Sequence, residues 1–254
     1  MHSRLILGSL LVVAMSAGVA LADTACLTVM TGTQSLATLA ANGNNCLIIG
    51  DKEFFNFQFI PDPLNPNTVT AAGISVTTTG SGTPNDWYGI DFGSNLGSLN
   101  NINGAPGSDL FLDYDIKYSV QSTGPMLTDV WQLINASDVP RTNPNSGIVV
   151  TETANQHGGG ASAISTVSIN PDDAIDPPAE AGDHLIFNLN GVPTPVTRAD
   201  ITKDVRIDAY AGDKVTLSLI EQRFSEVPEP RSYALLLGMS LAALLWKKRA
   251  SANA

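Results

Sequence analysis

The strongest constraint on the fold is an alternation of apolar and polar side chains with a period of two. Between Asp109 and Val120, every even-numbered residue is apolar or aromatic, and every odd-numbered residue except Phe111 is polar. Successive side chains of a β-strand point to opposite faces, so this pattern predicts one long strand with a single buried face. The body of the chain shows no helical periodicity, apart from a short turn expected in residues 35–41.

Shorter stretches with the same alternation follow along the chain. Phe55, Phe57 and Phe59 alternate with Asn56 and Gln58, which predicts a strand with these three rings on one face. Turns are predicted where Gly, Pro, Asn and Ser cluster between the alternating stretches. Further strands are expected at residues 74–79, 87–92, 130–135, 148–153, 163–169, 184–189, 204–209 and 215–219.

About ten short strands separated by turns predict an all-β protein, an antiparallel β-sandwich. The alternation argues against a parallel sheet, because the strands of such a sheet are buried on both faces. With the two ends of the chain set aside, residues 23–225 are long enough for one domain with a sizeable core.

The N-terminus has the three parts of a secretory signal peptide. Arg4 precedes an apolar run over residues 5–20, and Ala20-Leu21-Ala22 is a small-x-small cleavage site. We therefore expect residues 1–22 to be a signal peptide that engages the Sec translocon and is cut after Ala22. A first transmembrane helix is the alternative, which the short run and the adjacent cleavage site disfavour.

The C-terminal segment, residues 226–254, also has three parts. Residues 233–246 carry no charge and as a helix would span roughly 21 Å, at about 1.5 Å per residue. A hydrocarbon core is about 30 Å thick, so the segment suits transient membrane insertion better than a permanent span. The basic end would stay cytoplasmic by the positive-inside rule; it consists of Lys247, Lys248 and Arg249.

Two prolines precede that apolar segment. Pro228 and Pro230 lack backbone N–H groups and favour an extended chain, which a processing enzyme can grip. The motif Val227-Pro228-Glu229-Pro230, the apolar helix and the basic end resemble the PEP-CTERM sorting signal of Gram-negative bacteria. Arg231 departs from that pattern, because a small or hydroxyl residue is commoner there.

The resemblance implies an exosortase as partner, an integral-membrane cysteine transpeptidase that cuts near the motif. It implies a protein held transiently in the inner membrane and then delivered to the cell surface or the extracellular space. An ordinary tail anchor is the alternative. In the body, Gly43-Asn44-Asn45-Cys46 and the Phe-rich strand after it are similar to the layout of this family, which supplies no catalytic signature.

The charge of the chain limits the classes of partner that it can bind. The chain has a net charge of −11, and five of its 13 basic residues lie in the two end segments, so the body is more acidic still. Such a surface repels nucleic acid.

Cys26 and Cys46 are the two cysteines, and export through an oxidising compartment predicts a disulfide between them.

The residues that could carry catalysis lack the partners they need. Gln156-His157-Gly158-Gly159-Gly160 resembles the oxyanion loop of lipases, but no Gly-x-Ser-x-Gly elbow accompanies it. His184 shares no local motif with His157. We therefore expect no enzyme activity and interpret the glycines as a chain reversal between two strands.

An Asp-rich stretch is the candidate metal site. Calcium binds several oxygen ligands in flexible geometry, and an extracellular acidic loop can supply them. The alternative is a solvated loop, since the spacing is not that of an EF-hand. No other cofactor is expected. The candidate ligands are Asp172, Asp173, Asp176 and Asp183.

Three aromatic residues are the candidate glycan-binding site. Trp87, Tyr88 and Trp131 could form a flat platform for sugar rings, although aromatic residues in strands are also common in cores. Exposure of the two tryptophans separates these interpretations.

The sequence thus predicts an exported, exosortase-sorted surface or extracellular-matrix protein with a structural role, associated with exopolysaccharide or biofilm. The alternative is a glycan-binding β-sandwich module, with or without calcium.

Overall fold

A computed structural model describes residues 26–63, 69–83, 87–101, 103–105, 107–138, 145–169 and 179–226. The expected signal peptide with Ala20 and Ala22, the sorting motif and the basic end lie outside this range. Among the described residues, no helix has the length and apolar character needed to cross a membrane.

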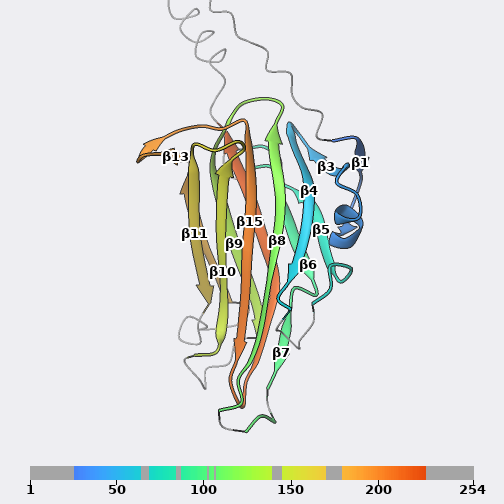
Figure 1. The fold of residues 1–254 in the computed structure, drawn as a ribbon, viewed down its shortest axis with the longest axis vertical. Coiled ribbons are helices and arrows are strands. Elements are labelled where there is room, and N and C mark those ends of the chain that lie inside the picture. The colour runs from blue at the N-terminus through green and yellow to red at the C-terminus, as the bar shows by residue number, and fades with distance from the viewer. Residues whose placement is uncertain are drawn as a thin grey trace, which may run out of the picture.

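The described chain forms two large β-sheets (Figure 1). The first sheet has nine strands, in the order β1 (Thr28–Met30), β3 (Asn45–Ile49), β4 (Lys52–Pro61), β8 (Leu110–Ser122), β15 (Arg198–Ala209), β10 (Gly147–Gln156), β11 (Ser162–Ile169), β13 (Asn188–Leu189) and β14 (Val192–Pro193). The second has seven, in the order β12 (Ala179–Ile186), β9 (Leu127–Asp138), β16 (Lys214–Glu226), β6 (Gly89–Ser94), β5 (Ile74–Thr79) and β2 (Gln34–Ser35), with β7 (Ser98–Asn100) also paired to β16.

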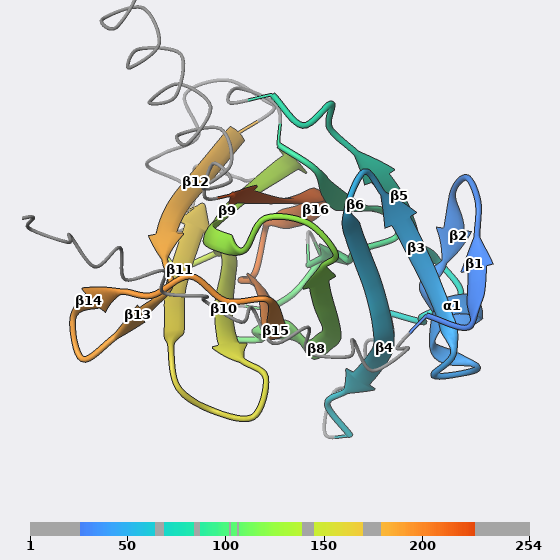
Figure 2. The ribbon, with the colours of Figure 1, turned by 90° about the horizontal axis from the view of Figure 1, so that it is seen from above.

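The sheets lie face to face, as the view from above shows (Figure 2). A single apolar cluster fills the space between them, with residues from both sheets. Strand β1 pairs with β3 in parallel, while the long central strands of both sheets pair antiparallel. The predicted all-β, sandwich-like architecture is therefore confirmed, with additional strands of two or three residues that are too short to show an alternating pattern.

The long strands follow the predicted alternation. In β8, Leu112, Tyr114, Ile116 and Val120 are buried, and in β15 the core side includes Val205. Strand β5 covers residues 74–79 as predicted. The periodicity of the sequence thus directly reflects which side of each strand faces the opposite sheet.

Strand β4 departs from the predicted pattern at one residue. Asn56 has a left-handed backbone, with φ of 57°, and the pairing with β8 shifts between Phe55 and Gln58. Such a bulge turns the residues on its two sides to different faces. Phe54 and Phe57 therefore enter the apolar cluster between the sheets. Phe55 is also buried but lies outside that cluster, beneath the Arg198 guanidinium, 4.8 Å from the ring centroid. The prediction that Phe55 shares a face with Phe57 is wrong for this reason.

The N-terminal part of the domain is closed by the predicted disulfide. Cys26 is bonded to Cys46 at the start of β3, with 5.5 Å between their Cα atoms. Between them, the short helix α1 (Leu36–Ala40) begins at Ser35, whose hydroxyl accepts a hydrogen bond from the Thr38 N–H at 3.1 Å. This helix packs two leucines into the core beside the sheet edge.

Replacing both cysteines (Cys26→Ala/Cys46→Ala) should lower the free energy of unfolding by about 3 kcal/mol, because the bridge limits the freedom of the unfolded chain across a loop of 20 residues. Urea titration of the oxidised protein and the variant measures the difference. Reduced wild-type protein should match the variant; equal midpoints for oxidised and reduced protein would contradict the prediction.

Candidate functional site

The expected metal ligands are only partly described. Asp172, Asp173 and Asp176 lie outside the described residues. Asp183, on β12, accepts a hydrogen bond from the Ser165 hydroxyl at 2.9 Å and another from the His184 N–H at 2.7 Å. Within the described ranges, no group of three or more His, Cys, Asp and Glu side chains is placed to hold a metal ion.

The three candidate aromatic residues have different surroundings. Trp131 lies on β9 with 38% of its surface exposed, whereas Trp87 and Tyr88 are half-buried just before β6. The Tyr88 ring packs on two glycines: a Cβ atom on Gly50 would lie 2.1 Å from it, and one on Gly82 2.6 Å from it. The Tyr88 ring is thus engaged with backbone, and strand β16 separates β6 from β9.

Trp131 lies on the outer face of the second sheet. Val130 and Gln132, the residues on either side of it in β9, are buried. Because successive side chains of a strand point to opposite faces, the Trp131 side chain points away from the interior of the sandwich. The strand pairing places His184 on one side of it and Arg223 on the other. Gly182 lies beside the indole, because a Cβ atom there would be in ordinary van der Waals contact with the Trp131 Nε1 atom, at 3.6 Å.

Polar side chains beside Trp131 are held in fixed positions. The Arg223 guanidinium, only 7% exposed, donates to the Asp91 carboxylate at 2.8 Å and to the Thr79 hydroxyl at 3.0 Å, and forms an ion pair with Glu221 at 2.8 Å. On the other side of Trp131, the His184 Nε2 atom lies 2.9 Å from a carboxylate oxygen of Asp129.

This arrangement is a candidate binding surface, which we call the Trp131 face: Trp131, His184, Asp129, Arg223, Asp91 and Glu221. It combines one partly exposed aromatic ring with hydrogen-bonded donors and acceptors on the outer face of the sheet. Carboxylate oxygens accept hydrogen bonds from hydroxyl groups. Glu221 and Asp91 also neutralise the charge of Arg223, which leaves the surface acidic.

A second polar group surrounds His157 on the first sheet. The His157 Nδ1 atom lies 2.8 Å from Asp200, and the Ser119 hydroxyl donates to the other oxygen of Asp200 at 2.6 Å. Burial raises the pKa of Asp200, but the hydrogen bonds from Ser119 and His157 outweigh it and hold the pKa below its usual value. Ser119 bonds to the carboxylate instead of the imidazole, so His157 has no serine to activate in this group.

The glycines after His157 form the predicted chain reversal. Gly158, Gly159 and Gly160 all have positive φ angles, between strands β10 and β11. These angles favour glycine, so the resemblance of this segment to an oxyanion loop has a structural explanation.

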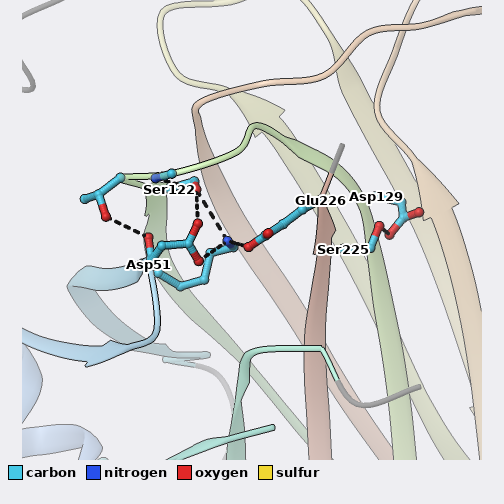
Figure 3. Close-up of polar contacts among 8 residues, drawn as sticks. Asp51, Ser122, Asp129, Ser225 and Glu226 are labelled. Atoms are coloured by element: carbon cyan, nitrogen blue, oxygen red, sulfur yellow. Dashed lines mark hydrogen bonds and ion pairs between the residues drawn. The ribbon is translucent and has the colours of Figure 1, made fainter. Parts of the chain in front are cut away.

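A third polar group holds the end of the last strand. Lys52 is fully buried, and its Nζ atom contacts Glu226, the Asp51 carboxylate at 2.6 Å and the Ser122 hydroxyl at 3.3 Å. Figure 3 shows Asp51 from the turn before β4, Ser122 from the end of β8 and Glu226 from the end of β16 meeting at this group, with Ser225 bonded to Asp129 nearby. Glu226 directly precedes Val227 of the expected sorting motif.

The pKa values of the two carboxyl groups around Lys52 are shifted in opposite directions. Burial raises the pKa of Asp51, but hydrogen bonds with Lys52 and Glu226 and the charge of Lys52 outweigh it, and the pKa is lowered overall. Burial raises the pKa of Glu226, and Asp51 adds to that effect, so Glu226 binds a proton more readily than a free glutamate.

Sequence reasoning missed a further polar group in the core. Lys203, Glu152, Gln132 and Gln222 are buried between the sheets. A signal was present, because Lys203 occupies the same alternating series as Val205, which predicts an inward side chain.

Comparisons with known proteins do not assign the chain to a family. No family model and no curated protein matches the chain. Among solved structures, TmCBM61 in complex with β-1,4-galactotriose has a TM-score of 0.30 and 10% identity, over 66% of this chain and 88% of that one. A Stig cyclase from Fischerella sp. TAU has a TM-score of 0.28 and 10% identity, over 67% and 86%. A carbohydrate-binding module of the β-sandwich superfamily has a TM-score of 0.21 and 11% identity, over 68% and 96%. Likenesses this remote carry no argument about ligand or activity.

Replacing Lys52 by methionine (Lys52→Met) should lower the free energy of unfolding by about 2–3 kcal/mol. Breaking a buried pair costs roughly 3–5 kcal/mol, and the partly exposed partners here reduce that loss. Chemical denaturation of the wild type and the variant measures this difference in the free energy of unfolding.

The control for Lys52→Met is Lys117→Met, which removes an exposed pair with Asp115. That variant should change stability by less than about 1 kcal/mol. Equal effects of the two substitutions would show that the Lys52 group does not stabilise the end of β16.

Proposed function

We propose that this protein is an exported β-sandwich that binds polysaccharide through the Trp131 face and has no catalytic activity of its own. The observation that carries the proposal is the exposed Trp131 indole between two ordered polar groups. A sugar ring presents an apolar face and a rim of hydroxyl groups. An aromatic ring can cover the former, while carboxylates and an imidazole bond to the latter.

Electrostatics favour a neutral glycan. Asp129 lies two residues before Trp131 on β9, while Asp91 and Glu221 are both paired with Arg223, the cross-strand neighbour of Trp131. A uronic acid or sulfated sugar would meet like charge without a spare cation, and like-charge juxtaposition disfavours such ligands. Neutral hexose polymers have hydroxyl groups that donate to carboxylates, so we expect them as the ligand class.

Replacing Trp131 by alanine (Trp131→Ala) should weaken binding of the preferred neutral polysaccharide roughly 10- to 100-fold, which corresponds to about 1.4–2.8 kcal/mol for one central aromatic contact. Isothermal titration with a panel of neutral and anionic polysaccharides identifies the ligand and measures the loss.

Ile164→Ala is the matched control for Trp131→Ala, because Ile164 is an exposed apolar residue on β11 of the other sheet. It should bind like the wild type. Unchanged affinity of Trp131→Ala, preference for anionic polymers, or flat titrations of the wild type with every polymer would each contradict the proposal.

A second proposal concerns delivery, and it is favoured by the C-terminal motif. We propose that an exosortase recognises Val227-Pro228-Glu229-Pro230 while residues 233–246 lie in the inner membrane, and that the body then reaches the cell surface or the matrix. The Lys52 group supports this proposal, because it holds the chain in the folded domain up to Glu226, directly before the motif. In the matrix, a structural role among exopolysaccharides is compatible with the binding proposed above.

Intact-mass measurement of the protein from wild-type and exosortase-deficient cells tests the delivery proposal. We expect loss of the C-terminal segment in the wild type and its retention in the deficient strain, because the prolines present an extended, accessible chain. Both strains should lose residues 1–22. An intact C-terminus in both would favour an ordinary tail anchor, whatever the outcome of the binding experiment.

A further inference from the structure

The space between the two sheets contains a lysine, a carboxylate and a carboxamide in direct contact. Lys203 lies on β15 and Glu152 on β10 of the first sheet, and Gln132 lies on β9 of the second. Lys203 and Glu152 are fully buried, and Gln132 is 1% exposed. Charged residues are rarely buried to this degree, so the group needs an explanation beyond packing.

The three side chains meet at the Lys203 Nζ atom. This atom lies 2.5 Å from the Gln132 Oε1 atom and 2.5 Å from the Glu152 Oε2 atom. Because a carbonyl bond is about 1.2 Å long, the carboxamide carbon of Gln132 lies within about 3.7 Å of the amine. Reacting atoms held about 3–3.5 Å apart are in near-attack geometry, so a small side-chain rotation suffices for contact.

We propose that Lys203 and Gln132 become joined by an isopeptide bond in the folded protein, with Glu152 transferring the proton. This inference is independent of the proposed function. A proton first passes from the Lys203 ammonium to the Glu152 carboxylate. The neutral amine then attacks the Gln132 Cδ atom, so that the Nζ–Cδ bond forms and the Cδ–Nε2 bond breaks. Glu152 carries one proton from Nζ to the leaving nitrogen, which departs as ammonia. No oxidant or other reactant is needed.

The surroundings favour the nucleophilic form of the lysine. Burial lowers the pKa of Lys203, although the neighbouring Glu152 opposes the effect. A low-dielectric site favours the neutral amine and acid over the two separate charges. Burial also keeps bulk water from the carboxamide, so hydrolysis does not compete with attack by the amine.

A second glutamine holds Glu152 in place. The Gln222 Nε2 atom donates to the Glu152 Oε1 atom at 3.0 Å, and the Tyr118 hydroxyl donates to the Gln222 Oε1 atom at 3.1 Å. The Glu152 Oε2 atom therefore remains directed at Lys203. Because Gln222 contacts the carboxylate while Gln132 contacts the amine, Gln132 is the glutamine that reacts.

The isopeptide product is also more favourable in the buried core than the Lys203–Glu152 ion pair from which it forms. A buried ion pair loses the hydration of both charges, and its attraction often fails to offset that loss. The isopeptide bond replaces a cation by a neutral amide and leaves Glu152 as an uncharged acid. It would join residues 71 positions apart on opposite sheets, in a region far in sequence from the disulfide.

Tryptic mapping of the exported full-length chain, denatured and reduced, tests the inference. We expect residues 118–141, which contain Gln132, to be joined to residues 199–206, with trypsin unable to cut after Lys203. The joined species should be about 17 Da lighter than the sum of its parts, the mass of one ammonia. Neither peptide includes the processed ends, so the result does not depend on sorting or glycan binding.

Lys52 is the internal control, because it is equally buried but its contacts are carboxylates and a hydroxyl; trypsin should cut after it normally. Glu152→Gln should abolish the joined species, and Glu53→Gln should retain it. Separate peptides from folded wild-type protein would overturn the inference, even where Glu152→Gln does not fold. A bond to the Gln222 peptide, residues 215–223, would overturn the assignment of Gln132.

Discussion

The structure depends on burial of one face of each sheet against the other. Neither face is stable in water alone, because each carries a continuous layer of apolar side chains such as Tyr114 and Ile116 on β8 and Ile134 on β9. Once these faces meet, the outer faces carry little of the apolar burial that holds the sandwich together. An exposed ring such as Trp131 can therefore serve recognition without loss of the fold.

The same constraint gives the buried polar group its unusual chemistry. Lys203, Glu152 and Gln132 occupy positions that the alternation assigns to the core, so the two sheets press them together without water. In water these groups would be solvated and unreactive toward each other. Between the sheets, the Gln132 carboxamide is held against the Lys203 amine, whose charged form is disfavoured by burial. The burial that stabilises the domain is therefore also what makes the proposed reaction possible.

The two ends of the domain are fastened by different means. The Cys26–Cys46 bridge holds the start, and the Lys52 group holds Glu226 at the end of β16. After Glu226 the sequence continues with the prolines, the apolar segment and the basic end that predict a sorting signal. The described part of β16 reaches Glu226, directly before this expected motif.

The sequence by itself determined most of the long strands, the two-layer all-β architecture and the disulfide, because side-chain alternation and cysteine pairing are local or compositional signals. It did not show that the expected strand over residues 184–189 divides between β12 and β13, which belong to different sheets. It named Trp131 as one of three aromatic candidates but left open which was exposed. Only the tertiary structure placed Tyr88 against Gly50, turned Phe55 away from the cluster between the sheets and brought Lys203 to Gln132. Alternation tells which way a side chain points from its own strand; which strands stand opposite is decided by pairing between residues far apart in the chain.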